Sequence, residues 1–173
     1  MPNLILIENE YPDGDALLHV LNYVLRSDLY GGYAVDPIQA YRQMVMVKNV
    51  YHKREGKQLL HFIVSFTTSE AYRVTIDEVL DLGFHIAELF GEYQTVYAVH
   101  MDGSHIHIHM VMNSISFVDG HRYRDGLVGF WKVRSELEQL FPRSDVGLYR
   151  SFPLSNCNRY LEADANKQFL RIG

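Results

Sequence analysis

The chain has 173 residues, of which 47% are hydrophobic and 21% charged, a composition typical of one globular domain. The net charge of -5 argues against a protein that coats nucleic acid without specificity, and a single cysteine, Cys157, excludes an internal disulfide framework. No stretch approaches the roughly 18 apolar residues of a membrane span, and the N-terminal LILI run is too short for a signal peptide.

The N-terminal part of the chain predicts a strand followed by a helix. The strand covers residues 4–8 and ends at the turn signal YPDGD. Apolar side chains then recur at helical spacing over residues 17–25, with Asp13 or Asp15 as the N-cap. The YGGY segment that follows is expected to break this helix.

The middle of the chain predicts a second helix, a buried strand and a third helix. Asp36 and Pro37 are typical of an N-cap and a first helical residue. The apolar, partly β-branched segment 59–66 predicts a strand. Thr75 and Glu78 have the spacing of a capping box, which predicts that another helix begins there.

The clearest hairpin consists of TVYAVHM, the turn DGS and HIHIHMVMNSISF. The amphipathic helix FWKVRSELEQLF follows and is expected to end at Pro142. Beyond about residue 143 the pattern is weak. The order β, α, α, β, α, β, β, α predicts a single α+β domain over residues 1–173, with a central antiparallel sheet of about five strands and flanking helices.

Four histidines lie in this hairpin. Side chains on a strand alternate with period two, so His105, His107 and His109 share one face. A tight turn would put His100 of the preceding strand opposite His105, and a four-residue loop would put it opposite His107. Either register brings three imidazoles together, which predicts a site for one divalent cation with open coordination positions.

Three neutral imidazoles leave the full charge of a bound ion available to a ligand, and by affinity they suit zinc, nickel or manganese. Ligating histidines are normally oriented by a partner on their other ring nitrogen. Asp102, Asp36 and Glu8 are the candidate partners in this chain.

The motif His107-Ile108-His109, with His100 seven residues ahead and Asn113 after it, resembles the metal motif of conjugative relaxases, the mobilisation nucleases of the HUH superfamily. The spacing is similar to that of the MobP class, which includes the T-DNA border endonuclease. The resemblance implies an HUH-type, RRM- or palm-like sheet with His100, His107 and His109 as ligands. It leaves His105 adjacent to the site as a possible further ligand or orienting residue.

Other segments resemble the same family in the same order, over roughly residues 4–125. Asn22-Tyr23-Val24 is similar to the first motif, which carries the nucleophilic tyrosine, and a GY-x-x-DP stretch follows it. His61-Phe-Ile-Val-Ser65 is similar to the second motif, whose serine helps hold DNA near the nick. The resemblance therefore implies Tyr23 as the nucleophile.

The resemblance also implies an activity and partners. A relaxase nicks one DNA strand at the origin of transfer of a plasmid or integrative element, leaving a 5′-phosphotyrosine and a free 3′-hydroxyl, for conjugative mobilisation. Mg²⁺ or Mn²⁺ is the ion expected in use, although Zn²⁺ or Ni²⁺ could occupy the site. The expected setting is the bacterial cytoplasm, with single-stranded origin DNA, accessory relaxosome proteins and a coupling protein as partners and no membrane.

Alternatives for the nucleophile remain open. Tyr30 and Tyr33 lie in a glycine-flanked segment near Tyr23 in the sequence. A rolling-circle replication initiator or an HUH transposase would instead carry its tyrosine after the histidines, and the candidates are Tyr123, Tyr149 and Tyr160. A noncatalytic DNA-binding relative would keep the scaffold and bind metal without cleaving DNA.

DNA contact depends on local charge. The acidic excess lies in residues 1–40, whereas residues 41–61 carry a balance of +4 that includes Lys48. Tyr51, Phe117 and Tyr123 interleave with basic residues and are candidates for stacking on bases. The predicted DNA-contacting residues are Arg26, Lys53, Arg54, Lys57, His61, Ser65, Arg122 and Arg124.

Overall fold

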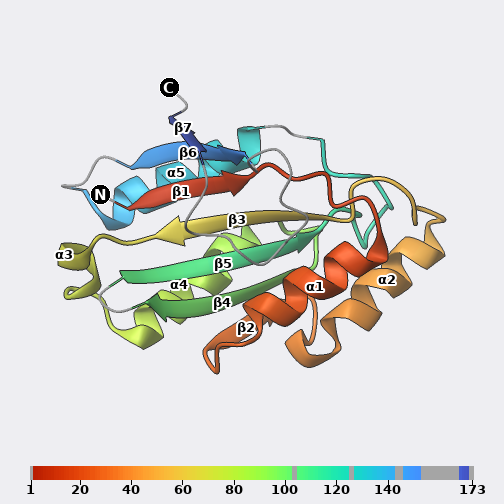
Figure 1. The fold of residues 1–173 in the computed structure, drawn as a ribbon, viewed down its shortest axis with the longest axis horizontal. Coiled ribbons are helices and arrows are strands. Elements are labelled where there is room, and N and C mark those ends of the chain that lie inside the picture. Colours follow the sequence, from red (N-terminus) through yellow and green to blue (C-terminus); the bar gives the residue numbers. More distant parts are fainter. Residues whose placement is uncertain (1, 103–104, 125–126, 143–145, 153–167, 172–173) are drawn as a thin grey trace.

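The computed structural model describes residues 2–102, 105–124, 127–142, 146–152 and 168–171. Their strands form one sheet in the order β2-β4-β5-β3-β1-β6-β7, with helices on both faces (Figure 1). Every neighbouring pair is antiparallel except β1 and β6, so the α+β prediction is confirmed. The strands are β1 (Asn3–Ile7), β2 (Tyr30–Tyr33), β3 (Leu59–Ser65), β4 (Thr95–Asp102), β5 (His105–Asn113), β6 (Gly147–Phe152) and β7 (Gln168–Arg171).

The sheet has seven strands where about five were expected. The YGGY segment forms β2 at one edge, because Gly31 leaves room for the ring of Tyr97 on β4. At the other side, β6 pairs with β1, and β7 pairs with β6. Neither β6 nor β7 shows the alternation of polar and apolar residues by which a strand is recognised in sequence.

Side chains cap helical segments at the residues predicted for this role. The carboxylate of Asp13 accepts a hydrogen bond from the Ala16 amide, and Thr75 and Glu78 form a complete capping box. Asp36 caps the 3-10 turn η1, which leads directly into α2. The helices are α1 (Gly14–Val24), η1 (Pro37–Gln39), α2 (Ala40–Val50), α3 (Thr68–Ala71), α4 (Ile76–Glu88) and α5 (Val128–Leu140).

Each face of the sheet has its own hydrophobic core. Helices α1 and α2 pack on the face to which Val96 and Ala98 of β4 belong, and α4 and α5 pack on the opposite face with Tyr97 and Val99 (Figure 1). Because side chains alternate along a strand, His100 belongs to the α1 face. Each fully buried large apolar side chain stabilises the fold by roughly 1.5–3 kcal/mol.

Helix α4 approaches the sheet closely at a glycine. A Cβ atom at position 83 would lie 2.6 Å from Cδ2 of Tyr97, and a Cβ atom at Gly31 of β2 would come too close to Cζ of the same ring. One aromatic ring on β4 therefore sets the spacing of both α4 and the edge strand β2.

Candidate metal centre

The register of the hairpin brings three histidines together. His100 of β4 pairs directly with His107 of β5, and Ala98 pairs with His109, so the alternative in which His100 lies opposite His107 is the observed one. The ring centroid of His109 lies 4.5 Å from that of His100 and 4.9 Å from that of His107.

These three side chains suit a divalent cation. Each offers one ring nitrogen, and the three nitrogens lie within 4.8 Å of one another. His109 is 1% exposed, whereas His100 and His107 are partly exposed, so the cluster opens to solvent on one side. Three neutral imidazoles on an accessible face are a donor set that can hold one metal ion with positions left for a ligand.

The C-terminus of α1 orients His100. Its Nε2 lies 2.8 Å from the carbonyl oxygen of Val24, one of the carbonyls that a helix end leaves without a partner inside the helix. A carbonyl only accepts, so Nε2 carries the proton and Nδ1 of His100 is the nitrogen that can bind a metal. This contact also fixes the end of α1, and with it Tyr23, beside the histidines.

His109 is oriented by another histidine. Nε2 of His61 on β3 lies 2.9 Å from Nδ1 of His109, and Nδ1 of His61 lies 3.4 Å from the hydroxyl of Tyr11. His61 is 8% exposed and Tyr11 is 2% exposed. The ring predicted to contact DNA is therefore turned into the protein, toward the buried histidine of the triad.

The sequence predicts the strand face on which His61 lies, but not the strand that lies next to it. His61 and Ser65 are separated by four residues on a predicted strand, so they share a face. That this strand lies next to β5, with Ile63 opposite His109, is set by tertiary pairing that no local pattern encodes.

Of the candidate orienting acids, Asp102 lies closest to the triad. Its Oδ2 is 3.7 Å from Nε2 of His107, too far for a direct hydrogen bond, and its side chain is 68% exposed. Its partner in the strand register, His105, is exposed and lies outside the triad.

The other two acids have different contacts. Asp36 caps η1, beyond Tyr33, which pairs with Thr95 at the end of β4 farthest from His100. Glu8 forms an ion pair of 3.3 Å with Arg150. Asp36 therefore caps a turn at the opposite end of the strand, and this position gives no support to the prediction that it serves the metal site.

Tyr23 lies against the triad. Its ring centroid is 5.4 Å from that of His109 and 5.7 Å from that of His100. The guanidinium of Arg26 lies over the same ring, with Cζ 5.8 Å from the centroid. The side chain is half-buried, so the ring is part of the wall of the histidine cluster and is also within reach of solvent.

The neighbouring tyrosines differ in the face that they occupy. Tyr30 pairs with Ala98 and therefore shares the histidine face, at the edge of the sheet. Tyr33 is on the opposite face, where its hydroxyl donates to the carbonyl of Gly91. Tyr33 is thus separated from the histidines by the sheet itself.

The C-terminal tyrosines lie farther from the histidines. Tyr123 packs against Phe90 and Tyr93 in the core on the opposite face. Tyr149 of β6 shares the histidine face, but β1 and β3 separate it from β5, a distance of roughly 14 Å at the usual strand spacing. Tyr160 lies outside the described residues.

A polar row crosses the sheet at the level of the triad. Ser65 of β3 pairs with His107 on one side and with Asn3 of β1 on the other, so the three side chains share a face. Ser65 is half-buried beside the triad, where the second motif would place it. Asn3 was not singled out in the sequence, because its strand is the first in the chain and carries no motif.

The predicted basic residues lie at the other end of the same strands. Lys53 and Arg54 are exposed in the loop before β3, next to the pairing of Leu59 with Asn113. Ser65 lies six positions along β3 from Leu59, which is roughly 20 Å of extended chain. Arg26 is the predicted basic contact that adjoins the triad.

Arg122 binds its own chain. Its guanidinium donates to the backbone carbonyls of Lys53, Glu55 and Lys57, and burial is the main cause that lowers its pKa. This geometry does not support the prediction that Arg122 contacts DNA, because its guanidinium is hydrogen-bonded to the loop of residues 53–57. Arg124 is exposed beside it.

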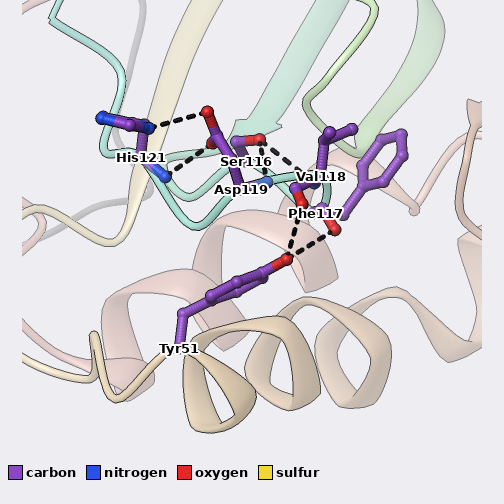
Figure 2. Close-up of polar contacts among 6 residues, drawn as sticks. All are labelled: Tyr51, Ser116, Phe117, Val118, Asp119 and His121. Carbon is purple, nitrogen blue, oxygen red and sulfur yellow. Dashed lines mark hydrogen bonds and ion pairs between the residues drawn. The ribbon is translucent and has the colours of Figure 1, made fainter.

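The turn after β5 is also hydrogen-bonded to Tyr51, the C-cap residue of α2. Figure 2 shows the hydroxyl of Tyr51 donating to the carbonyls of Phe117 and Val118, at 3.2 and 2.8 Å. Within the turn, the carboxylate of Asp119 accepts from His121 (Figure 2). Tyr51 is thus tied to this turn, whereas the side chain of Phe117 is 36% exposed and is the better placed of the two for stacking.

Lys48 is a buried residue and contributes nothing to a surface patch. It is 2% exposed and donates to Oδ1 of Asn113, whose amide donates in turn to Gln94. Burial, and next the charge of Arg122, lower the pKa of Lys48 from 10.5 to about 7. The spacing of Ala40, Met44 and Lys48 by four residues is the sequence signal that places it on the buried face of α2.

A histidine triad on an α+β sheet, with a tyrosine from the first helix against it, is the arrangement that the resemblance to relaxase nucleases predicted. The profile of the family described as "Relaxase: MobA/VirD2-like, nuclease domain" matches residues 22–141, more than half of the chain. The chain belongs to this relaxase family.

Two relatives support the assignment. The chain is 28% identical over 100 residues to "Protein rlx" of Staphylococcus aureus, and 25% identical over 109 residues to "Protein TraI" of Escherichia coli. The matched segments are 57% and 63% of this chain but only 30% and 14% of those two proteins. No solved structure matches significantly. Among the described residues, no helix is long and apolar enough to span a membrane.

Proposed function

We propose that the chain nicks single-stranded DNA at an origin of transfer, with Tyr23 as the nucleophile and a metal ion held by the three histidines. The observation that carries the proposal is the contact of the Tyr23 ring with His100 and His109. A nucleophile and the metal that binds its target phosphate must meet within a few ångströms.

The reaction is a transesterification. The phenol of Tyr23 gives up its proton to solvent, and its oxygen attacks the phosphorus of the scissile phosphodiester. The bond from phosphorus to the 3′ oxygen breaks, and that oxygen takes up a proton from solvent and leaves as the 3′-hydroxyl. A bound divalent ion supplies Lewis-acid charge to the phosphate oxygens. Free tyrosine has a pKa of about 10, so local positive charge is needed to stabilise the phenolate. The guanidinium of Arg26, over the ring, contributes such charge.

Other residues bind the strand. Ser65 and Asn3 lie in the row that contains His107 and can donate to phosphate or base on the open part of the face. The phosphate backbone of the DNA would be contacted at the far end of strands β3 and β5 by Lys53, Arg54, Lys57 and Arg124. The accessory and coupling proteins of a mobilisation system, in the bacterial cytoplasm, are the partners that this function requires.

The test uses single-stranded oligonucleotides that tile the origin region of the element that encodes the chain, incubated with the protein and Mn²⁺. A 3′-labelled strand should migrate with the protein on a denaturing gel, because the 5′-phosphate is linked to tyrosine. A 5′-labelled strand should be released as a shorter product that a polymerase can extend.

Tyr23→Phe should reduce the adduct to background. The matched control is Tyr30→Phe, which removes a hydroxyl from the same face and should leave the adduct intact. An adduct that survives in Tyr23→Phe and maps to Tyr149 would favour a nuclease of the replication-initiator type. Metal binding without any cleavage would favour a noncatalytic relative.

A further inference from the structure

Two buried side chains, His61 and Tyr11, lie next to His109 of the triad. His61 contacts Nδ1 of His109 at 2.9 Å, and the hydroxyl of Tyr11 contacts the other nitrogen of His61 at 3.4 Å. The rings of His61 and His109 are stacked, with centroids 5.2 Å apart and planes inclined by 30°. The three residues come from the loop before α1, from β3 and from β5, so the contact joins segments far apart in the sequence.

We propose that His61 is a positioning residue that presents Nε2 of His109 to the metal, and that Tyr11 fixes the orientation of His61. This inference rests on the metal site of the proposed function and extends it to residues that do not bind the ion. It assigns to His61 a task other than contact with DNA.

The hydrogen-bond chemistry makes the arrangement directional. When the metal occupies Nε2 of His109, the proton of that ring is on Nδ1 and is donated to Nε2 of His61. The proton of His61 is then on Nδ1 and is directed to the oxygen of Tyr11. A bound ion would therefore set the tautomers of two imidazoles in series, and the oxygen of Tyr11 would accept the last proton of the series.

The contact at Nδ1 of His109 is the imidazole of His61 and not a carboxylate, which has a chemical consequence. Ligating histidines commonly donate to a carboxylate, whose negative charge increases the basicity of the ligand. Here the contact of His109 is an imidazole, so it orients the ring without adding negative charge beside the ion. A metal centre that must attract a phosphate keeps more of its positive charge in this way.

The experiment measures metal affinity directly, by calorimetric titration of the full chain with Mn²⁺ in the absence of DNA. His61→Leu removes the partner of Nδ1 and should weaken binding by about 10–100-fold, the usual effect of removing such a contact. His61→Gln places an amide near the position of Nε2 and should restore affinity to within a few-fold of the unchanged protein. His85→Gln is the control, because this exposed histidine is paired with Glu136 on α5.

A second measurement separates positioning from general stability. Long-range ¹H–¹⁵N spectra of the metal-free protein should show His109 protonated at Nδ1, and Tyr11→Phe should convert part of this population to the other tautomer. If His61→Leu fails to fold, Tyr11→Phe and His61→Gln still decide the question.

The outcomes are distinct. If the unchanged chain binds Mn²⁺ and His61→Leu binds it equally well, the role of His61 is wrong while the metal site stands. If the unchanged chain binds no divalent ion, the metal site of the proposed function fails, and the role of His61 fails with it. Equal loss of affinity in His61→Gln and His61→Leu would also overturn the role, since the amide would then rescue nothing.

Discussion

At the scale of single residues, the molecule uses histidine in three different ways. His109 is almost fully buried in the triad, His61 lies behind it, and His105 is exposed at the end of the same strand. Alternation along β5 identified the face correctly, but it could not separate a ligand from a neighbour. That distinction depends on which side chains lie on the adjacent strands.

Lys48 leads to a prediction about pH. Its pKa is about 7 in the folded chain and 10.5 in the unfolded chain, so between these values the unfolded state binds more protons. The free energy of unfolding therefore rises with pH across this window, and the full penalty, at most about 5 kcal/mol, is present below pH 7.

Lys48→Met should remove this slope. Urea unfolding at pH 7, 8 and 9 should show stability that rises with pH for the unchanged chain relative to Lys48→Met. Lys53→Met alters an exposed lysine and should leave the slope in place. Parallel curves for the unchanged chain and Lys48→Met would show that Lys48 keeps an ordinary pKa in the folded state.

At the scale of elements, close packing of α4 on the sheet overrides helix propensity. Replacing glycine by alanine inside a helix normally stabilises it by up to about 1 kcal/mol. At position 83 the added methyl group would lie 2.6 Å from the Tyr97 ring, which also lies close to Gly31.

Gly83→Ala should therefore destabilise the protein, by about 1–3 kcal/mol, the usual range for overpacking. Chemical unfolding measures the change. Adding Tyr97→Leu should relieve the clash, so the double variant should lose less than the sum of the two single variants. Strict additivity would contradict the proposed contact.

The elements that sequence predicted well are those with local signals. The helix that follows Asp13 and the helix that follows Thr75 both begin at side chains that cap them, and the hairpin follows from alternation. Strand β2 was missed because two glycines are typical of a turn, whereas here Gly31 leaves room for the ring of Tyr97 and Gly32 lies close to the carbonyl oxygen of Val35. The contacts of Arg122 with backbone carbonyls could not be predicted, because a charged residue has the same appearance in sequence whether it binds a phosphate or a carbonyl.

At the scale of the whole molecule, charge is distributed along the length of the sheet. The triad lies at one end of β3 and β5, and the exposed Lys53 and Arg54 lie beyond the other. An oligonucleotide that reaches both must span roughly 20 Å. The chain as a whole is acidic, so binding should depend on this local path rather than on net attraction.

Replacing Lys53 and Arg54 together by alanine should weaken single-stranded DNA binding uniformly across sequences. Each phosphate contact contributes about 0.7 to the slope of log affinity against log salt concentration, so the slope should fall by about 1.4. Fluorescence anisotropy over a salt series measures it. Arg73→Ala with Lys132→Ala removes the same charge from exposed positions outside residues 41–61, and an equal fall in that variant would mean that only net charge matters.

The position of β1 in the sheet has a consequence for folding during synthesis. Strand β1 is synthesised before both of its neighbours in the sheet, β3 and β6, and its Asn3 pairs with Gly147. Its second edge is covered only after synthesis has reached Gly147 and the rest of β6. Such long-range closure slows folding and leaves an apolar edge open during synthesis, so chaperone dependence of expression should be traceable to these five residues.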